Sequence, residues 1–181
     1  MNRVTRAKRD LSRLAKKQIV DKRGRKTTVY VRPEGLSKAD LLSMYDRDQA
    51  VRNNPDSTWA DYKAIDTENL SKMKAHTEKH GWNFQGDNEF KAWVIVQHGD
   101  HDPGYQAWVL SRMKEKSSRK DLMAYLEDRV LVNTGNPQKY GTQVVQKKGK
   151  YVPRKLADKA KVDEYRKEAG LEPLSEYLKG F

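Results

Sequence analysis

The sequence contains no cysteine, and this absence excludes several kinds of site. The chain can form no disulfide, hold no zinc through thiolates and use no thiol nucleophile. It also has no apolar run near the roughly 20 residues that a membrane-spanning helix needs. Its N-terminus is basic without a following apolar stretch, which is not the pattern of a secretory signal. We expect a cytoplasmic, intracellular protein, or a virion-associated one if a phage encodes it.

Several familiar motifs are absent as well. The chain has no GxxxxGK[ST] or GxGxxG phosphate-binding loop, no GxSxG and no HExxH. It has no defensible helix-turn-helix pattern and no RNP-type aromatic motif. A sequence-specific DNA- or RNA-binding regulator is therefore the weakest of the functions considered below.

The positive charge is concentrated at the N-terminus. The 181 residues carry a net charge of +12, and residues 1–35 hold twelve Lys or Arg against three Asp or Glu, a net +9. The remaining residues are nearly balanced at +3. This asymmetry predicts a polyanionic partner for the N-terminal arm, either nucleic acid or an acidic protein surface. The alternative is a solubilising tail. The basic residues expected to bind the polyanion are Arg3, Arg6, Lys8, Arg9, Arg13, Lys16, Lys17, Lys22, Arg23, Arg25 and Lys26.

The pattern predicts a mainly α protein in two parts. Residues 1–35 form a basic arm, with a short helix over 5–17 and a β-hairpin around Gly24. Residues 36–181 form one compact helical domain of about five helices with one or two small β-hairpins. We expect no transmembrane segment and make no prediction of oligomeric state.

Capping signals divide the first half of the domain into helices. Ser37 and Asp40 start a helix that ends near Pro55. Residues 59–64 read as a short turn or helix, and 66–79 as a separate helix stopped by Gly81. Residues 88–100 form a third helix whose centre is apolar on all sides, so it is expected to be the most buried element.

The second half follows the same logic. Asp102 caps a helix with Pro103 at its first position, and Ser118 caps the next one. A small hairpin surrounds Gly149, and a last helix covers residues 157–169. The side chains expected to be largely buried are Trp93, Val96, Trp108 and Leu126.

The densest polar cluster, Gln97 to Asp102, directly follows the most apolar helix. Imidazole and carboxylate groups together can carry out acid–base chemistry or bind a divalent metal. His98 is the predicted acid–base or metal-binding group, with Asp100 and Asp102 as its carboxylate partners. No cofactor is predicted other than a divalent metal at His98, Asp100 and Asp102. The structural alternative is a hydrogen-bonded helix junction in which Asp102 is a cap.

Three other groups carry candidate chemistry. Asp48 and Gln49 lie beside Arg52, and Asp128 precedes Arg129; both acidic residues could simply form ion pairs. The loop 138–143 gathers a phenol, a hydroxyl and amides, which suits either ligand binding or the satisfaction of buried polar groups.

With these residues in view, the chain resembles the uncharacterised bacterial and phage family catalogued as domain of unknown function 6624, from about Leu36 to Leu178. The resemblance rests on DQAVR at 48–52, D-x-x-N at 66–69, Gly81-Trp82, AWVIVQHGDHDPGYQ at 92–106, AYLEDRV at 124–130, GNPQKYGTQ at 135–143 and VDEYRKEAGLEPLSEYL at 162–178. Asn83 stands where the family pattern has proline. The family label implies no activity.

The resemblance implies that a set of polar residues recurs together: Asp48, Gln49, His98, Asp100, Asp102, Gln106, Asp128, Arg129, Tyr140 and Gln143. We predict that His98, Asp100, Asp128, Arg129 and Tyr140 approach one another. The catalytic candidates are His98, Asp100, Asp102, Asp128, Arg129 and Tyr140. Arg129 would hold an anionic group of the substrate, and Tyr140 together with Gln143 would orient it. Asp48, Gln49, Gln106 and Gln143 are candidate ligand-binding residues.

Two functions remain after this reading. The favoured one is a non-enzymatic accessory or structural protein, phage- or mobile-element-encoded, whose arm docks on a polyanion. The alternative is a hydrolase-like enzyme or small-ligand-binding domain. A pocket containing His98 together with Asp128 and Arg129 would favour the enzyme, whereas buried or scattered residues would favour the accessory protein.

Overall fold

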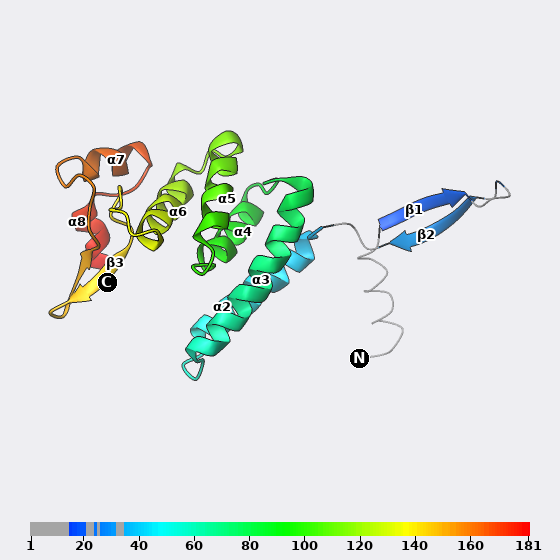
Figure 1. Ribbon diagram of the computed structural model, residues 1–181, viewed down its shortest axis with the longest axis horizontal. Coiled ribbons are helices and arrows are strands. Elements are labelled where there is room, and N and C mark those ends of the chain that lie inside the picture. The colour runs from blue at the N-terminus through cyan, green and yellow to red at the C-terminus, as the bar shows by residue number, and fades with distance from the viewer. Residues whose placement is uncertain (1–14, 21–23, 25, 32–34) are drawn as a thin grey trace.

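A computed structural model describes residues 15–20, 24, 26–31 and 35–181 (Figure 1). This part of the chain contains seven α-helices and two two-stranded antiparallel sheets, so the predicted mainly α fold is confirmed. The helix count exceeds the expected five, and the short α8 near the C-terminus has no counterpart among the predicted helices. None of the described helices is both long enough and apolar enough to cross a bilayer.

The predicted hairpin of the arm is present. β1 (Ala15–Val20) pairs antiparallel with β2 (Lys26–Val31), with Val20 opposite Lys26 next to the turn. The helix predicted over 5–17 is wrong at its end, because residues 15–17 belong to β1; its first ten residues lie outside the described part. Among the predicted polyanion-binding side chains, the structure describes that of Lys26, which is exposed.

Capping boxes start the first two helices of the domain. α2 (Lys38–Asn53) begins with Ser37 and Asp40 bonded to each other's backbone N–H groups, as predicted. α3 (Trp59–His80) begins with the same arrangement between Thr58 and Asp61. The predicted break near residue 65 is wrong, because α3 is continuous. It contains no Gly or Pro, and the Thr67 hydroxyl donates to a backbone carbonyl of the preceding turn instead of capping a new helix.

α4 (Asp87–Gln97) is the central element of the core. All five residues from Ala92 to Val96 are buried, and the helix packs against α2, α3, α5 and α6. The buried Trp93 also donates its indole N–H to the Leu122 carbonyl at 2.8 Å. Burial of Trp93, Val96 and Leu126 is confirmed.

Burial of Trp108 was predicted wrongly: this residue is 37 % exposed on α5 (Pro103–Lys116). Its ring stacks on Tyr105 at the surface, with the Arg112 guanidinium over its face. Stacking and cation–π contacts of this kind stabilise an aromatic side chain at the surface, so it need not be buried in the core. The Asp102 cap of α5 is confirmed, with its carboxylate accepting from the Tyr105 N–H.

α6 (Lys120–Asn133) begins one residue later than predicted. Arg119 is the N-cap and makes no side-chain capping bond, so the expected Ser118 cap is wrong. The Ser117 hydroxyl instead accepts from the Arg119 N–H in the connecting turn.

The C-terminal segment forms its own small layer beside α6, at the end of the helical domain in Figure 1. It contains β3 (Val144–Lys147), β4 (Lys150–Pro153), α7 (Val162–Glu168), α8 (Leu174–Tyr177) and the 3-10 helix Leu178–Gly180. The hairpin around Gly149 is confirmed. The last predicted helix starts at Val162 and not at 157, because the Asp158 carboxylate accepts from two backbone N–H groups and holds a turn there.

Candidate functional site

The site is built at the C-terminal end of α4, where His98 caps the helix. The next residue, Gly99, lies against α3: a Cβ placed there would come within 2.7 Å of the Leu70 side chain. A side chain at position 99 would therefore require Leu70 to move. This close approach positions the imidazole of His98 between α2 and α3.

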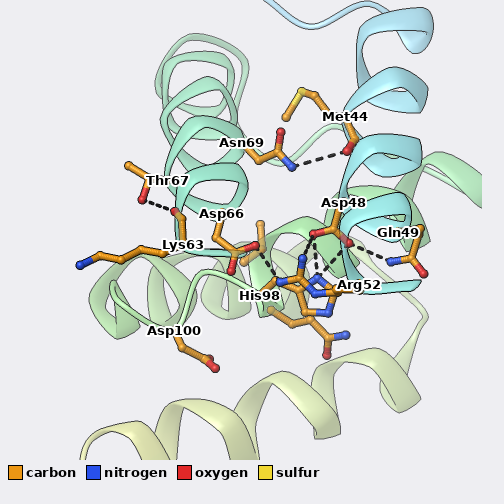
Figure 2. Close-up of polar contacts among 12 residues, drawn as sticks. Met44, Asp48, Gln49, Arg52, Lys63, Asp66, Thr67, Asn69, His98 and Asp100 are labelled. Atoms are coloured by element: carbon orange, nitrogen blue, oxygen red, sulfur yellow. Dashed lines mark hydrogen bonds and ion pairs between the residues drawn. The ribbon is translucent and has the colours of Figure 1, made fainter. Parts of the chain in front are cut away.

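His98 pairs with a fully buried carboxylate, Asp48 on α2. The imidazole Nδ1 lies 3.0 Å from both Asp48 oxygens, and Asp48 is 0 % exposed (Figure 2). Because a carboxylate only accepts, this contact favours the tautomer with the proton on Nδ1. Nε2, on the other side of the ring, makes no hydrogen bond to the described residues and carries the free lone pair. The pair has the arrangement of a histidine base oriented by a carboxylate.

Arg52 joins this pair to a second carboxylate. One guanidinium nitrogen lies 2.7 Å from Asp48 and another lies 2.7 Å from Asp66 on α3. Burial raises the pKa of Asp66 above its usual value, and the hydrogen bond from Arg52 opposes that rise. Gln49 donates to the other oxygen of Asp48 at 2.8 Å. Asp48 is thus held by three side chains from two helices.

A second polar group lies at the same end of α4. Arg129 donates to the Gln97 carbonyl and to Asp100, at 2.8 and 2.9 Å. Gln106, 0 % exposed, donates to the Val96 and Gln97 carbonyls, each at 3.1 Å. These donors satisfy carbonyls that have no partner within the helix and place a cation at its negative end. Gln106 is therefore a structural cap in this arrangement.

A pocket of about 380 Å³ opens beside these groups. Its lining combines imidazoles, cations, carboxylates and aromatic rings: Arg52, Trp59, Tyr62, Lys63, Asp66, His98, Asp100, His101 and Arg129. Trp59 is 85 % exposed at the rim and meets Tyr62 edge-on at 5.8 Å between ring centroids. The predicted His98, Asp100 and Arg129 therefore do meet at one cavity.

Asp128 faces a different environment. It is 0 % exposed and accepts from the backbone N–H groups of Lys139, Tyr140 and Thr142 and from the Thr142 hydroxyl. Burial raises the pKa of Asp128, and these donors oppose the rise. The prediction that all five residues form one group is wrong, because Asp128 and Tyr140 belong to this second, closed cluster. Neighbouring positions on α6 point to different faces, which separates Asp128 from Arg129.

The loop 138–143 supports that closed cluster. The buried Gln138 amide donates to the carbonyls of Gln143 and Arg154 and accepts from the Gln143 N–H. Buried Arg166 donates to the Tyr140 carbonyl at 2.8 Å. The Gln143 side chain donates to the Thr142 hydroxyl. Tyr140 and Gln143 therefore lie in the C-terminal layer, away from the pocket lining.

The two carboxylates that the sequence predicted as metal ligands beside His98 form ion pairs with other residues. Asp100 pairs with Arg129, and Asp102 pairs with Lys74 while capping α5. Within the described residues, a group with metal-ligand spacing consists of Asp48, Asp66 and His98, whose ligand atoms lie within 4.8 Å of one another. The Arg52 guanidinium already forms ion pairs with both of those carboxylates. A divalent ion would have to displace it, so this group fits a metal poorly.

Sequence reasoning gave no role to four residues of the pocket. Asp66 was noticed only as part of the D-x-x-N step, and Trp59, Tyr62 and Lys63 were assigned to a short connecting element. An aromatic pair three residues apart on a helix face was the available signal. It becomes informative only once α3 is known to begin at Trp59.

The family comparison agrees with the resemblance in the sequence. No curated protein and no solved structure matches the chain. Residues 35–181 match the family of unknown function DUF6624, and the basic arm lies outside that match. The chain therefore belongs to DUF6624 through its whole helical domain.

Proposed function

We propose that the helical domain binds a small anionic substrate and acts on it as a hydrolase-like enzyme, with His98 as general base. The observation that carries this proposal is the Asp48–His98 pair at the wall of an open pocket. A purely structural histidine has no need of an adjacent cavity lined by cations. This proposal replaces the accessory role as the favoured function of the domain.

The proposed step is hydrolysis by an activated water. His98 Nε2 accepts a proton from water as the oxygen attacks the substrate's carbonyl or phosphoryl centre. The resulting imidazolium donates that proton to the leaving group as the scissile bond breaks. Asp48, held by Arg52 and Gln49, keeps Nδ1 protonated and stabilises the imidazolium. Atoms and protons balance without a further reactant.

The charges of the pocket favour an anionic group on the substrate. Lys63 has no ion-pair partner in the described part of the chain, and Arg129 uses only one of its two terminal nitrogens. Both can therefore donate to an anion. Trp59 and Tyr62 offer an aromatic wall for an apolar portion of the same molecule.

The test is hydrolysis of a panel of chromogenic carboxylic and phosphoric esters. His98→Asn should lower kcat/KM about 10²–10⁴-fold with an unchanged thermal midpoint. His101→Asn is the matched control, because His101 lines the same pocket in an exposed position and should change the rate little. Equal losses in both variants, or a collapse of stability on changing His98, would overturn the proposal.

We also propose that the arm docks the protein on nucleic acid. The net +9 within residues 1–35 carries this proposal. Binding to duplex DNA should be non-specific, with each phosphate contact adding about 0.9 to the slope of log K against log salt concentration. Deletion of residues 1–35 should lower that slope strongly. Unchanged binding after the deletion would contradict it.

A further inference from the structure

The hairpin of β3 and β4 and the turn after it form a second basic surface, separate from the arm. Residues 144–161 carry seven basic residues against Asp158, a net +6. The seven are Lys147, Lys148, Lys150, Arg154, Lys155, Lys159 and Lys161, and all are exposed. None of them makes a side-chain ion pair with another described residue, whereas Lys72, Lys74 and Lys114 elsewhere on the domain each pair with an acidic residue.

At the tip of the hairpin, lysines occupy positions that strand pairing and turn geometry disfavour. Lys147 lies directly opposite Lys150 in the antiparallel register, a like-charged pair that opposes strand pairing. Lys148 adopts a φ of +49°, a region that lysine rarely occupies, and Gly149 completes the two-residue turn at +77°. An Asn at 148 would suit this turn better. Residues that conflict with local structure point to a function for the charge.

An exposed aromatic pair joins this hairpin to the last residue of the chain. Tyr151 is 40 % exposed and Phe181 is 55 % exposed, with their ring centroids 5.1 Å apart. Successive side chains of a strand point to opposite faces, so Tyr151 lies on one face of the hairpin, and Lys147 and Lys150 lie on the other. The narrow tip therefore presents ammonium groups and an accessible ring on its two faces, and a single strand that wraps the tip can contact both through phosphates and a stacked base.

We infer that this surface, called here the β3–β4 tip (residues 147–151 with Phe181), binds single-stranded nucleic acid. Lys147, Lys148 and Lys150 contact phosphates, and a base stacks on Tyr151. The inference is independent of the pocket and of His98. It names a site in the helical domain, whereas the proposal above assigns polyanion binding to the arm.

The experiment uses the full chain and a fluorescent mixed-sequence 20-nucleotide DNA strand, with anisotropy measured over a salt series. The test variant is Lys147→Gln with Lys148→Asn and Lys150→Gln. Its charge-matched control changes Lys38, Lys116 and Lys120 to Gln, three exposed lysines without ion pairs to described residues. The arm stays intact in every protein, so its contribution is common to all.

The tip variant should lower the salt slope by about 2, since each phosphate contact on a single strand contributes about 0.7. Its thermal midpoint should stay the same or rise, because the like-charged pair is gone. The control should lose much less of the slope. Equal slopes in the two variants would overturn the inference.

Tyr151→Leu separates stacking from charge. It should weaken single-strand binding about tenfold and leave binding of the matching duplex nearly unchanged. Duplex binding as tight as single-strand binding, with no effect of Tyr151→Leu, would overturn the assignment to single strands. Poly-glutamate competing as well as poly-thymidylate for the tip would instead identify an acidic protein as its partner.

Discussion

Asp48 and Asp128 are both completely buried carboxylates, yet they differ in what surrounds them. Asp128 is held mainly by backbone N–H groups of one loop, which have no second role. Asp48 is held by the side chains of His98, Arg52 and Gln49. Two of these side chains, His98 and Arg52, also line a pocket. Burial alone therefore does not distinguish the two acids, whereas their hydrogen-bond partners do.

The largest effect should come from Asp128→Ala. The change leaves three backbone N–H groups without an acceptor, and each orphaned donor costs about 1–3 kcal/mol. We expect the free energy of unfolding to fall by roughly 3–6 kcal/mol in a denaturant titration. Asp121→Ala removes a half-exposed ion pair with Arg119 and leaves no buried donor cluster, so it should cost clearly less, about 1 kcal/mol. Similar losses in the two variants would mean that the loop does not depend on Asp128.

Asp48→Asn should have a smaller effect on stability and a specific effect on His98. Arg52 keeps its bond to Asp66, so we expect a loss of about 1–3 kcal/mol. The amide no longer favours a proton on Nδ1, and nitrogen-15 NMR should report a shift toward the Nε2–H tautomer. Asp46→Asn, an exposed change on the same helix, is the control. An unchanged His98 tautomer would contradict the pairing described above.

The smallest effect concerns Glu68, which joins α3 to α2 through Arg47 at 2.9 and 2.7 Å. Hydrogen bonds from Arg47 and Lys72 lower the pKa of Glu68 from 4.5 to about 2. A lowered folded-state pKa adds stability above the unfolded value, and this is lost as pH falls from about 4.5 toward 2.

Because this pair is exposed, its contribution should stay below about 1 kcal/mol. Glu68→Gln should therefore be slightly less stable than the wild type at pH 7, and the difference should shrink near pH 2–3. A stability difference between the wild type and Glu68→Gln that grows as the pH falls would contradict this prediction.

Local signals in the sequence located most helix boundaries. Capping boxes and the Asp102-Pro103 step act within four residues, so Ser37 and Asp102 could be identified without the fold. Helix continuity was harder: Asp66-Thr67 resembles a start signal, but nothing between Trp59 and His80 breaks the helix. Local chemistry permits both outcomes there, and the packing of α3 on α2 and α4 decides between them.

The partners of the site residues depend on contacts between distant segments. Asp48 and His98 are 50 residues apart, and the i,i+4 spacing of Asp48 and Arg52 suggested an exposed pair. That ion pair exists, but Asp48 is buried because α4 covers this face of α2. Likewise, the sequence placed Asp128 next to Arg129 but could not show that they serve different clusters.

The continuity of α3 sets the distance between the pocket and the junction with the N-terminal arm. Near its start, Asp66 lines the pocket, and ten residues later His76 accepts the Leu36 N–H at 2.9 Å, where the arm joins the domain. Because a helix rises about 1.5 Å per residue, Asp66 and His76 lie roughly 15 Å apart along α3. The continuity of α3 therefore fixes the spacing between the junction with the arm and the pocket, and a molecule that contacts both must span that length.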